Sequence, residues 1–181
     1  MKVLAVGCGE GEIAEHIGSL GVQVLCIDES EKLVDHAQNQ STTKNASYRQ
    51  GSYEDLQLGK KFDLITIFRV MEKVPKSKIS KFLASIVLHA NASTIIYLNM
   101  TDGRYLKYSN QTDHDDDDEV IEKGYTPDVV LTLLAGHHFQ PYHIGFYGED
   151  VPIQYNEYLF ATDTTFSKTC RKVTFDSEDQ P

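Results

Sequence analysis

The chain has 181 residues, of which 40% are hydrophobic and 24% are charged. These values are typical of a single globular domain with its own core. The formal net charge of −10 opposes broad contact with the phosphate backbones of nucleic acids. No apolar run approaches the roughly 20 residues that span a bilayer, and no signal peptide precedes the first expected strand. We therefore expect a cytoplasmic protein without a membrane segment.

The three cysteines, Cys8, Cys26 and Cys170, are an odd number and lack the CxxC spacing of many zinc sites. Cys8 and Cys26 lie on or beside apolar segments. This pattern predicts buried, reduced thiols in a reducing compartment and no zinc site.

Short apolar runs alternate with amphipathic segments over the first hundred residues. Strands are expected at residues 2–6, 23–27, 47–50, 62–68 and 94–98. Helices are expected between them, at residues 12–20, 30–38 and along an apolar face that runs from Ile79 to Val87.

The last third of the chain begins with a helix signal and ends with two β-rich runs. Thr126, Pro127 and Asp128 supply a cap, a first-turn proline and an acid in that order. Residues 139–147 and 153–162 are expected to be strands, and the short connection between them requires an antiparallel pair.

This alternation predicts an α/β fold with a doubly wound, mostly parallel seven-stranded sheet and helices on both of its faces. The last two strands add a C-terminal antiparallel β-hairpin at one edge. Residues 1–165 are expected to form one domain with an inserted segment at about 100–124, and residues 166–181 a polar tail.

The first strand is followed by three alternating glycines, Gly7, Gly9 and Gly11, and the second strand ends in an acid, Asp28. Glycines let backbone N–H groups approach a ligand closely at the start of a helix. A carboxylate at the end of the next strand can accept hydrogen bonds from ribose hydroxyls. The unit predicts a site for a nucleoside-bearing cofactor. Its G-x-G-x-G spacing differs from the G-x-G-x-x-G of nicotinamide dehydrogenases.

Four segments together resemble the class I S-adenosylmethionine-dependent methyltransferases, in particular the small-molecule group that includes ubiquinone-biosynthesis enzymes. Residues 3–11 are similar to the family's first motif, and Asp28 stands at the position of its ribose-binding acid. Residues 50–56 are similar to its adenine-binding turn, and residues 62–74 to its fourth-strand motif and the following loop. The resemblance implies a Rossmann-like fold, S-adenosylmethionine as the cofactor and methyl transfer as the activity.

The resemblance also implies a role for each matching residue. The glycine turn would line the methionine end of the cofactor, and the acids after the second strand would bind its ribose. The adenine and the sulfonium would lie against the third and fourth strands. The cofactor-binding residues implied in this way are Gly7, Cys8, Gly9, Gly11, Asp28, Glu29, Ser52, Tyr53, Phe68 and Arg69.

We expect in-line transfer of a methyl group to an oxygen or nitrogen atom of a small molecule or biosynthetic intermediate. A general base is needed only if the acceptor keeps its proton at the working pH, so no base is assigned. Candidate catalytic residues are Arg69 after the fourth strand, and Arg104 and Tyr105 in the inserted segment. The acidic run at residues 113–119 is interpreted as a solvated loop and not as a metal site.

Two other functions stay open. Family members usually carry acids where this chain has Ala5 and Ser52, which favours a catalytically inactive methyltransferase-like scaffold or partner module. A nucleic-acid methyltransferase is disfavoured by the negative charge and by residues 68–71, which lack the Asn/Asp-Pro-Pro-Tyr/Phe signature. A lid is expected from residues 100–124, ordering when ligands bind, or from another subunit in a homo-oligomer or complex.

Overall fold

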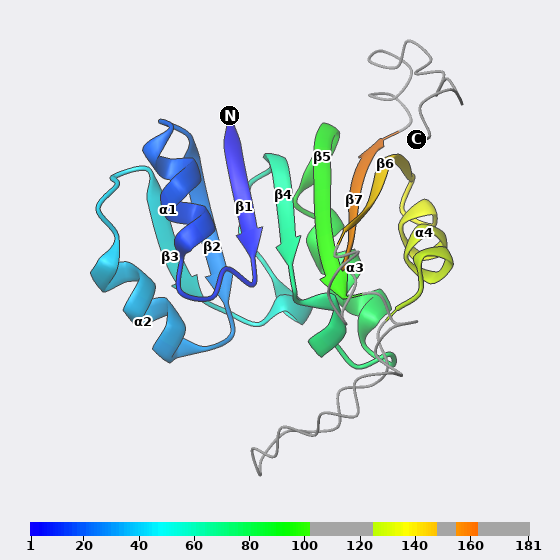
Figure 1. Cartoon of the computed structure of the whole chain (residues 1–181), viewed down its shortest axis with the longest axis horizontal. Coiled ribbons are helices and arrows are strands. Elements are labelled where there is room, and N and C mark those ends of the chain that lie inside the picture. Colours follow the sequence, from blue (N-terminus) through cyan, green and yellow to red (C-terminus); the bar gives the residue numbers. More distant parts are fainter. Residues whose placement is uncertain (102–124, 148–154, 163–181) are drawn as a thin grey trace.

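The computed structural model describes residues 1–101, 125–147 and 155–162, which form a seven-stranded sheet flanked by helices (Figure 1). The strands are β1 (Lys2–Val6), β2 (Gln23–Asp28), β3 (Ala46–Gln50), β4 (Phe62–Phe68), β5 (Ala90–Thr101), β6 (Phe139–Tyr147) and β7 (Tyr155–Thr162). The helices are α1 (Glu12–Ser19), α2 (Glu31–Gln40), α3 (Ile79–Val87) and α4 (Pro127–Ala135), with single-turn 3₁₀ helices η1 (Tyr53–Asp55) and η2 (Met71–Lys73).

The strand order across the sheet is β3-β2-β1-β4-β5-β7-β6. Strands β1 to β5 pair in parallel, while β7 pairs antiparallel with both β5 and β6. The expected doubly wound α/β fold with a terminal antiparallel hairpin is therefore confirmed. The strand order reverses between β1 and β4, and ligands of such sheets bind at the carboxyl ends of the strands beside this reversal.

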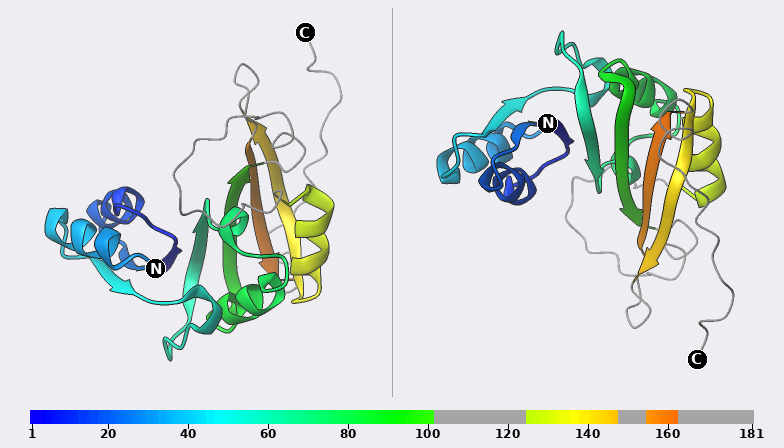
Figure 2. Two further views of the ribbon diagram at one scale, coloured as in Figure 1. Left: turned by 90° about the horizontal axis from the view of Figure 1, so that it is seen from below. Right: turned by 90° about the horizontal axis from the view of Figure 1, so that it is seen from above.

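Side chains along each strand alternate between the two faces of the sheet, so each face has its own apolar cluster. Helices α1 and α2 cover one face, and α3 and α4 cover the other (Figure 2). The cluster under α1 and α2 is small, and its buried members are Val3, Ala5, Ala14, Val24 and Cys26. The cluster on the opposite face is much larger and includes the buried side chains of Phe62, Ile65, Phe82, Leu83, Ile96, Tyr158 and Phe160.

Strand β5 begins at Ala90, earlier than the expected start at residue 94. The Thr94 hydroxyl donates to the Phe62 carbonyl at 2.6 Å and accepts from the Asn91 N–H at 2.7 Å. These bonds support a register shift between β4 and β5 at Phe62 and Leu64, so a polar stretch can stay inside the paired strand.

The inserted segment at about 100–124 lies almost entirely outside the described residues, as does the tail at 166–181. None of the helices in the described ranges is long and apolar enough to cross a membrane.

Candidate functional site

A cavity of about 590 Å³ opens at the carboxyl ends of β1, β2 and β4. Its walls come from the glycine turn after β1, the end of β2, the first turns of α1 and α2, η1, and the loop after β4. The residues that line it are Gly7, Cys8, Gly9, Glu10, Glu12, Ile13, Asp28, Glu29, Ser30, Leu33, Tyr53, Phe68, Arg69, Val70, Lys73 and Val74.

The glycine turn packs tightly between β2 and the loop that follows β4. Gly7 has a φ of 73° and Gly9 a φ of 53°, which are left-handed values that favour glycine. A Cβ atom added to Gly7 would overlap Cγ2 of Val70. The Gly7 N–H donates to the Ile27 carbonyl at 2.9 Å. The turn is thus held in a conformation that only glycine adopts easily.

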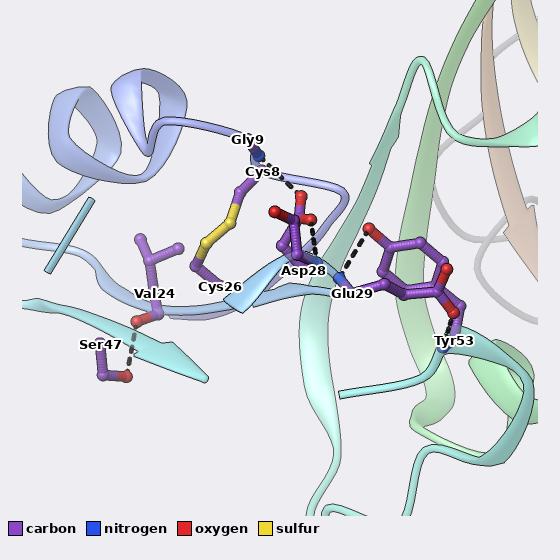
Figure 3. Close-up of a disulfide and its surroundings, with 9 residues drawn as sticks. Cys8, Gly9, Val24, Cys26, Asp28, Glu29, Ser47 and Tyr53 are labelled. Carbon is purple, nitrogen blue, oxygen red and sulfur yellow. Dashed lines mark hydrogen bonds between the residues drawn. A yellow bond between two sulfur atoms is a disulfide. The ribbon is translucent and has the colours of Figure 1, made fainter. Parts of the chain in front are cut away.

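Asp28 ends β2 with a buried carboxylate whose two oxygens are both bonded to the backbone (Figure 3). Its Oδ2 accepts from the Gly9 N–H at 2.9 Å, and its Oδ1 accepts from the Ser30 N–H at 3.0 Å. These bonds fix the carboxylate at the wall of the cavity. Because each carboxylate oxygen can accept more than one hydrogen bond, Asp28 can also accept from a ligand.

Glu29 and Tyr53 hold each other through two reciprocal hydrogen bonds (Figure 3). Glu29 Oε1 accepts from the Tyr53 N–H at 3.1 Å, and the Tyr53 hydroxyl oxygen accepts from the Glu29 N–H at 3.3 Å. Burial and the charge of nearby Asp28 raise the pKa of the Tyr53 phenol above its usual value, so the phenol stays protonated. The Tyr53 ring packs edge-to-face against Phe82, with ring centroids 6.2 Å apart.

Arg69 stands at the edge of the cavity in the loop after β4. Its φ of 56° is uncommon for a residue with a side chain, and such conformations cluster at functional sites. The Arg69 N–H donates to the Asn99 carbonyl at 3.0 Å, and its Nε donates to the buried carboxylate of Glu72. Glu72 also accepts from the Thr101 N–H at 3.1 Å. Arg69 is therefore anchored to the end of β5, and its charge is balanced by a buried acid.

Cys8 and Cys26 form a disulfide, with their Cα atoms 5.9 Å apart (Figure 3). The expectation of reduced thiols is wrong for this pair in the structure. The sequence shows an odd cysteine count but does not show that the turn after β1 folds back beside β2. The observed Cα separation lies within the range of roughly 4.4–6.8 Å that disulfides require.

The structure brings most of the expected cofactor-binding residues together around this one cavity. Those that line it are Gly7, Cys8, Gly9, Asp28, Glu29, Tyr53, Phe68 and Arg69.

Gly11 and Ser52, which were also expected at the cofactor, lie outside the cavity lining. A Cβ atom on Gly11 would lie 2.8 Å from Cβ of Ala37 and 2.9 Å from Cε1 of Tyr48, so this glycine allows close packing of α1, α2 and β3. Ser52 is exposed, and its hydroxyl oxygen caps η1 by accepting from the Glu54 N–H at 3.3 Å.

The candidate catalytic residues Arg104 and Tyr105 lie outside the described residues, as does the acidic run at 113–119. Within the described ranges, no group of three His, Cys, Asp or Glu side chains is placed to hold a metal ion.

Sequence reasoning misses several lining residues, among them Ile13, Leu33 and Lys73. Helical periodicity assigns Ile13 and Leu33 to the faces that pack on the sheet. The first turns of α1 and α2, however, lie beside the carboxyl ends of β1 and β2, where ligands bind. Their position directly after the glycine turn and after Asp28 is the signal that could have identified them.

Residues 3–91 match a family described as a methyltransferase domain. The ubiquinone biosynthesis O-methyltransferase of Acinetobacter baumannii (strain AYE) is 42% identical over 81 residues, which are 41% of this chain and 33% of that protein. The protein of the same name from Xanthomonas axonopodis pv. citri is 36% identical over 106 residues, 55% of this chain and 44% of that protein. The matched regions thus span less than half the length of these relatives.

A solved structure with a similar fold is magnesium protoporphyrin IX methyltransferase from Synechocystis PCC 6803 with bound S-adenosylhomocysteine. The TM-score is 0.71 at 17% sequence identity, and the likeness covers 88% of this chain and 74% of that chain. At this identity the likeness concerns the fold.

Proposed function

We propose that the chain is a class I S-adenosylmethionine-dependent methyltransferase, because residues 3–91 match a methyltransferase domain and parts of the chain are 36–42% identical to ubiquinone biosynthesis O-methyltransferases. It would bind S-adenosylmethionine in the cavity beside the glycine turn and transfer the methyl group to an oxygen or nitrogen atom of a small molecule. The observation that carries this proposal is the fixed, buried carboxylate of Asp28 at the end of β2, bonded to the Gly9 N–H.

The residues of the cavity fit this cofactor. The ribose hydroxyls would donate hydrogen bonds to the carboxylate of Asp28. Its two bonds to the backbone already hold this carboxylate in place, so it does not have to reorient when the ligand binds. The methionine end would lie against Gly7, Cys8 and Gly9, whose side chains are absent or small, so a ligand can approach their backbone closely. Tyr53 would border the adenine, and Phe68 and Arg69 would lie beneath the sulfonium.

The charges around the cavity also suit a cationic ligand. Glu10, Glu12, Asp28 and Glu29 line it, and a sulfonium is attracted by such carboxylates. An unpaired Arg69 would oppose that attraction. Its pairing with the buried carboxylate of Glu72 removes most of the repulsion.

When bound, S-adenosylmethionine supplies a methyl group on a positively charged sulfur, which leaves as a neutral thioether. The chain has to align the acceptor with the methyl group and exclude water. Phe68, which stacks on Tyr97 with ring centroids 6.0 Å apart, gives the sulfonium end of the cavity an apolar wall. Arg69 would help to orient the acceptor there. Arg104 and Tyr105 stay predictions.

We further propose that the acceptor is a small molecule, as for the O-methyltransferases that the chain resembles in sequence. The net charge of −10 argues against nucleic acid as the substrate. The cytoplasmic location, and the lid or second subunit that would cover the cavity, also stay predictions.

The variant Asp28→Asn tests the proposed cofactor site because it removes the charge of the carboxylate and keeps its shape. Hydrogen bonds to charged groups contribute about 1.5–3 kcal/mol, so we expect S-adenosylhomocysteine to bind roughly 10- to 150-fold more weakly. Isothermal titration under fixed redox conditions measures this change.

Asp63→Asn is the matched control. Asp63 is exposed at the opposite end of the sheet, where its carboxylate accepts from the Lys2 N–H at 2.7 Å, so the same charge change should leave cofactor affinity unaltered. Equal affinity in Asp28→Asn and the wild type would remove Asp28 from its proposed role. Absence of binding to the wild type by both S-adenosylmethionine and S-adenosylhomocysteine would instead favour the non-catalytic module.

A further inference from the structure

The disulfide joins the wall of the proposed cofactor cavity to the buried apolar cluster under α1 and α2 (Figure 3). Cys8 lies in the glycine turn, is partly exposed and lines the cavity. Cys26 lies on β2 opposite Ala5 of β1 and is completely buried. One residue of the pair is therefore partly exposed at the cavity, while the other belongs to the core.

Along the glycine turn, the disulfide at Cys8 is flanked by two hydrogen bonds that also connect the turn to β2. The Gly7 N–H donates to the Ile27 carbonyl at 2.9 Å, and the Gly9 N–H donates to Asp28 Oδ2 at 2.9 Å. Cys8 is the residue between these two glycines, and Cys26 is two residues before Asp28. Any movement of Cys8 relative to β2 therefore alters the contact between the turn and the carboxylate of Asp28.

Reduction breaks the covalent link between the turn and β2 and so permits such a movement. Cys26 is packed among Val3, Ala5 and Val24, and close-packed interiors resist displacement. Any movement that follows reduction therefore falls mostly on Cys8, whose turn faces the cavity.

We propose that Cys8 and Cys26 are a redox modification site that controls cofactor affinity. This inference rests on the function proposed above. In the oxidised form the turn is held in the geometry that leaves the cavity open, so less conformational freedom is lost when the cofactor binds. In the reduced form the turn gains freedom and the cofactor binds more weakly.

A low-molecular-weight disulfide such as oxidised glutathione is a sufficient oxidant. The thiolate of Cys8, the partly exposed residue of the pair, attacks one sulfur of oxidised glutathione, forming a mixed disulfide and releasing one glutathione thiolate. The thiolate of Cys26 then attacks Sγ of Cys8 and releases the second. The two cysteines lose two electrons and two protons, and oxidised glutathione becomes two molecules of glutathione. In reducing compartments such bonds are usually transient and redox-sensing.

The test uses the full chain equilibrated in reduced or in oxidised glutathione. Alkylation followed by mass spectrometry should show three labelled cysteines in the reduced protein and Cys170 alone as the free thiol in the oxidised protein. Isothermal titration should show that S-adenosylhomocysteine binds roughly 5- to 10-fold more tightly to the oxidised form, the lower end of measured coupling between sites.

Cys26→Ala should have the affinity of the reduced wild type in reduced glutathione. In oxidised glutathione its Cys8 can form only a mixed disulfide with glutathione, so the tighter binding of the oxidised wild type should be absent. Cys170→Ala, which keeps the pair, should retain the full response. Three labelled cysteines after oxidation, or a bond that forms without changing affinity, would each overturn the proposal. If neither redox state binds S-adenosylhomocysteine, the proposed function fails instead, and the labelling result still shows whether the bond forms.

Discussion

Under α3 and α4 the sheet buries a continuous set of large side chains, whereas under α1 and α2 the described residues bury only small and medium ones. Phe62, Phe82 and Phe160 are almost completely inaccessible on the first face. On the second face the glycine turn is held by hydrogen bonds and one disulfide. Because hydrophobic stabilisation scales with buried apolar area, the first face should supply most of the folding free energy. The second face carries the glycine turn that lines the cavity, and it buries little apolar area.

The two regions meet at the cavity, at two contacts. Tyr53 of the large cluster, which packs edge-to-face on Phe82, exchanges two hydrogen bonds with Glu29 after β2. Gly7 of the turn lies against Val70, another member of the large cluster. Residues of the large cluster thus help to hold the glycine turn and the end of β2 in position. Substitutions on each side of these contacts should separate effects on stability from effects on ligand binding.

Phe82→Ala should cause the largest loss of stability. Phe82 is fully buried in the large cluster, and truncating such a side chain costs about 3–5 kcal/mol through lost burial and the cavity that remains. Urea denaturation would measure the change in the free energy of unfolding. Val24→Ala in the small cluster is the matched control, and loss of two methyl groups should cost about 1.5–2 kcal/mol. Equal losses in the two variants would contradict the contrast between the faces.

Gly7→Ala should have the next largest effect on stability, with a lower minimum than Phe82→Ala. Its left-handed φ costs about 1–2 kcal/mol for alanine, and the overlap with Val70 adds an overpacking penalty of about 1–3 kcal/mol, for a total of roughly 2–5 kcal/mol. The comparison variant is Gly9→Ala, because Gly9 also has a positive φ but no atom lies within 4 Å of an added Cβ. Only the cost of the φ angle, about 1–2 kcal/mol, is expected there. Thermal unfolding of both variants isolates the contribution of Val70, and identical losses would show that this contact is unimportant.

Much of the fold could be predicted because the apolar runs of a buried parallel sheet are short and clearly bounded. Strands β1 and β4 begin and end where the sequence indicates, each closed by a turn directly after its last apolar residue. The start of β5 could not be found in this way. Residues 90–93 are mostly small or polar, and they join the strand because the Thr94 hydroxyl bonds across to Phe62.

For the candidate site, the glycine turn and Asp28 could be predicted because their spacing along the chain reflects one local βαβ unit. Contacts between segments that are far apart in the sequence could not be predicted in this way. Glu72 binds Arg69 nearby, yet its second partner, Thr101, is 29 residues away at the end of β5. The same applies to Cys8 and Cys26, whose pairing depends on where the turn folds relative to β2.

The smallest expected effect lies on the α1 and α2 face, at Glu15 of α1. Its carboxylate accepts hydrogen bonds from the Ser41 hydroxyl at 2.8 Å, the Thr42 N–H at 2.9 Å and the Thr43 N–H at 3.1 Å, and also from the Thr42 hydroxyl. The hydrogen bonds from the Thr42 and Ser41 side chains are the main reason that the pKa of Glu15 falls from its ordinary value of 4.5 to about 2. The ionised carboxylate therefore clamps α1 to the loop between α2 and β3.

A pKa that is lower in the folded state stabilises the fold above the unfolded-state pKa and loses this effect as the pH falls through the folded-state pKa. The wild type should therefore lose stability between pH 4.5 and about 2 more steeply than Glu15→Gln, and the two should converge near pH 2. Urea denaturation at a series of pH values measures this. Glu31→Gln, the same change at an exposed position in the first turn of α2, should leave the wild-type pH dependence in place. Parallel pH curves for the wild type and Glu15→Gln would show that hydrogen bonds do not hold this region together and that its packing alone suffices.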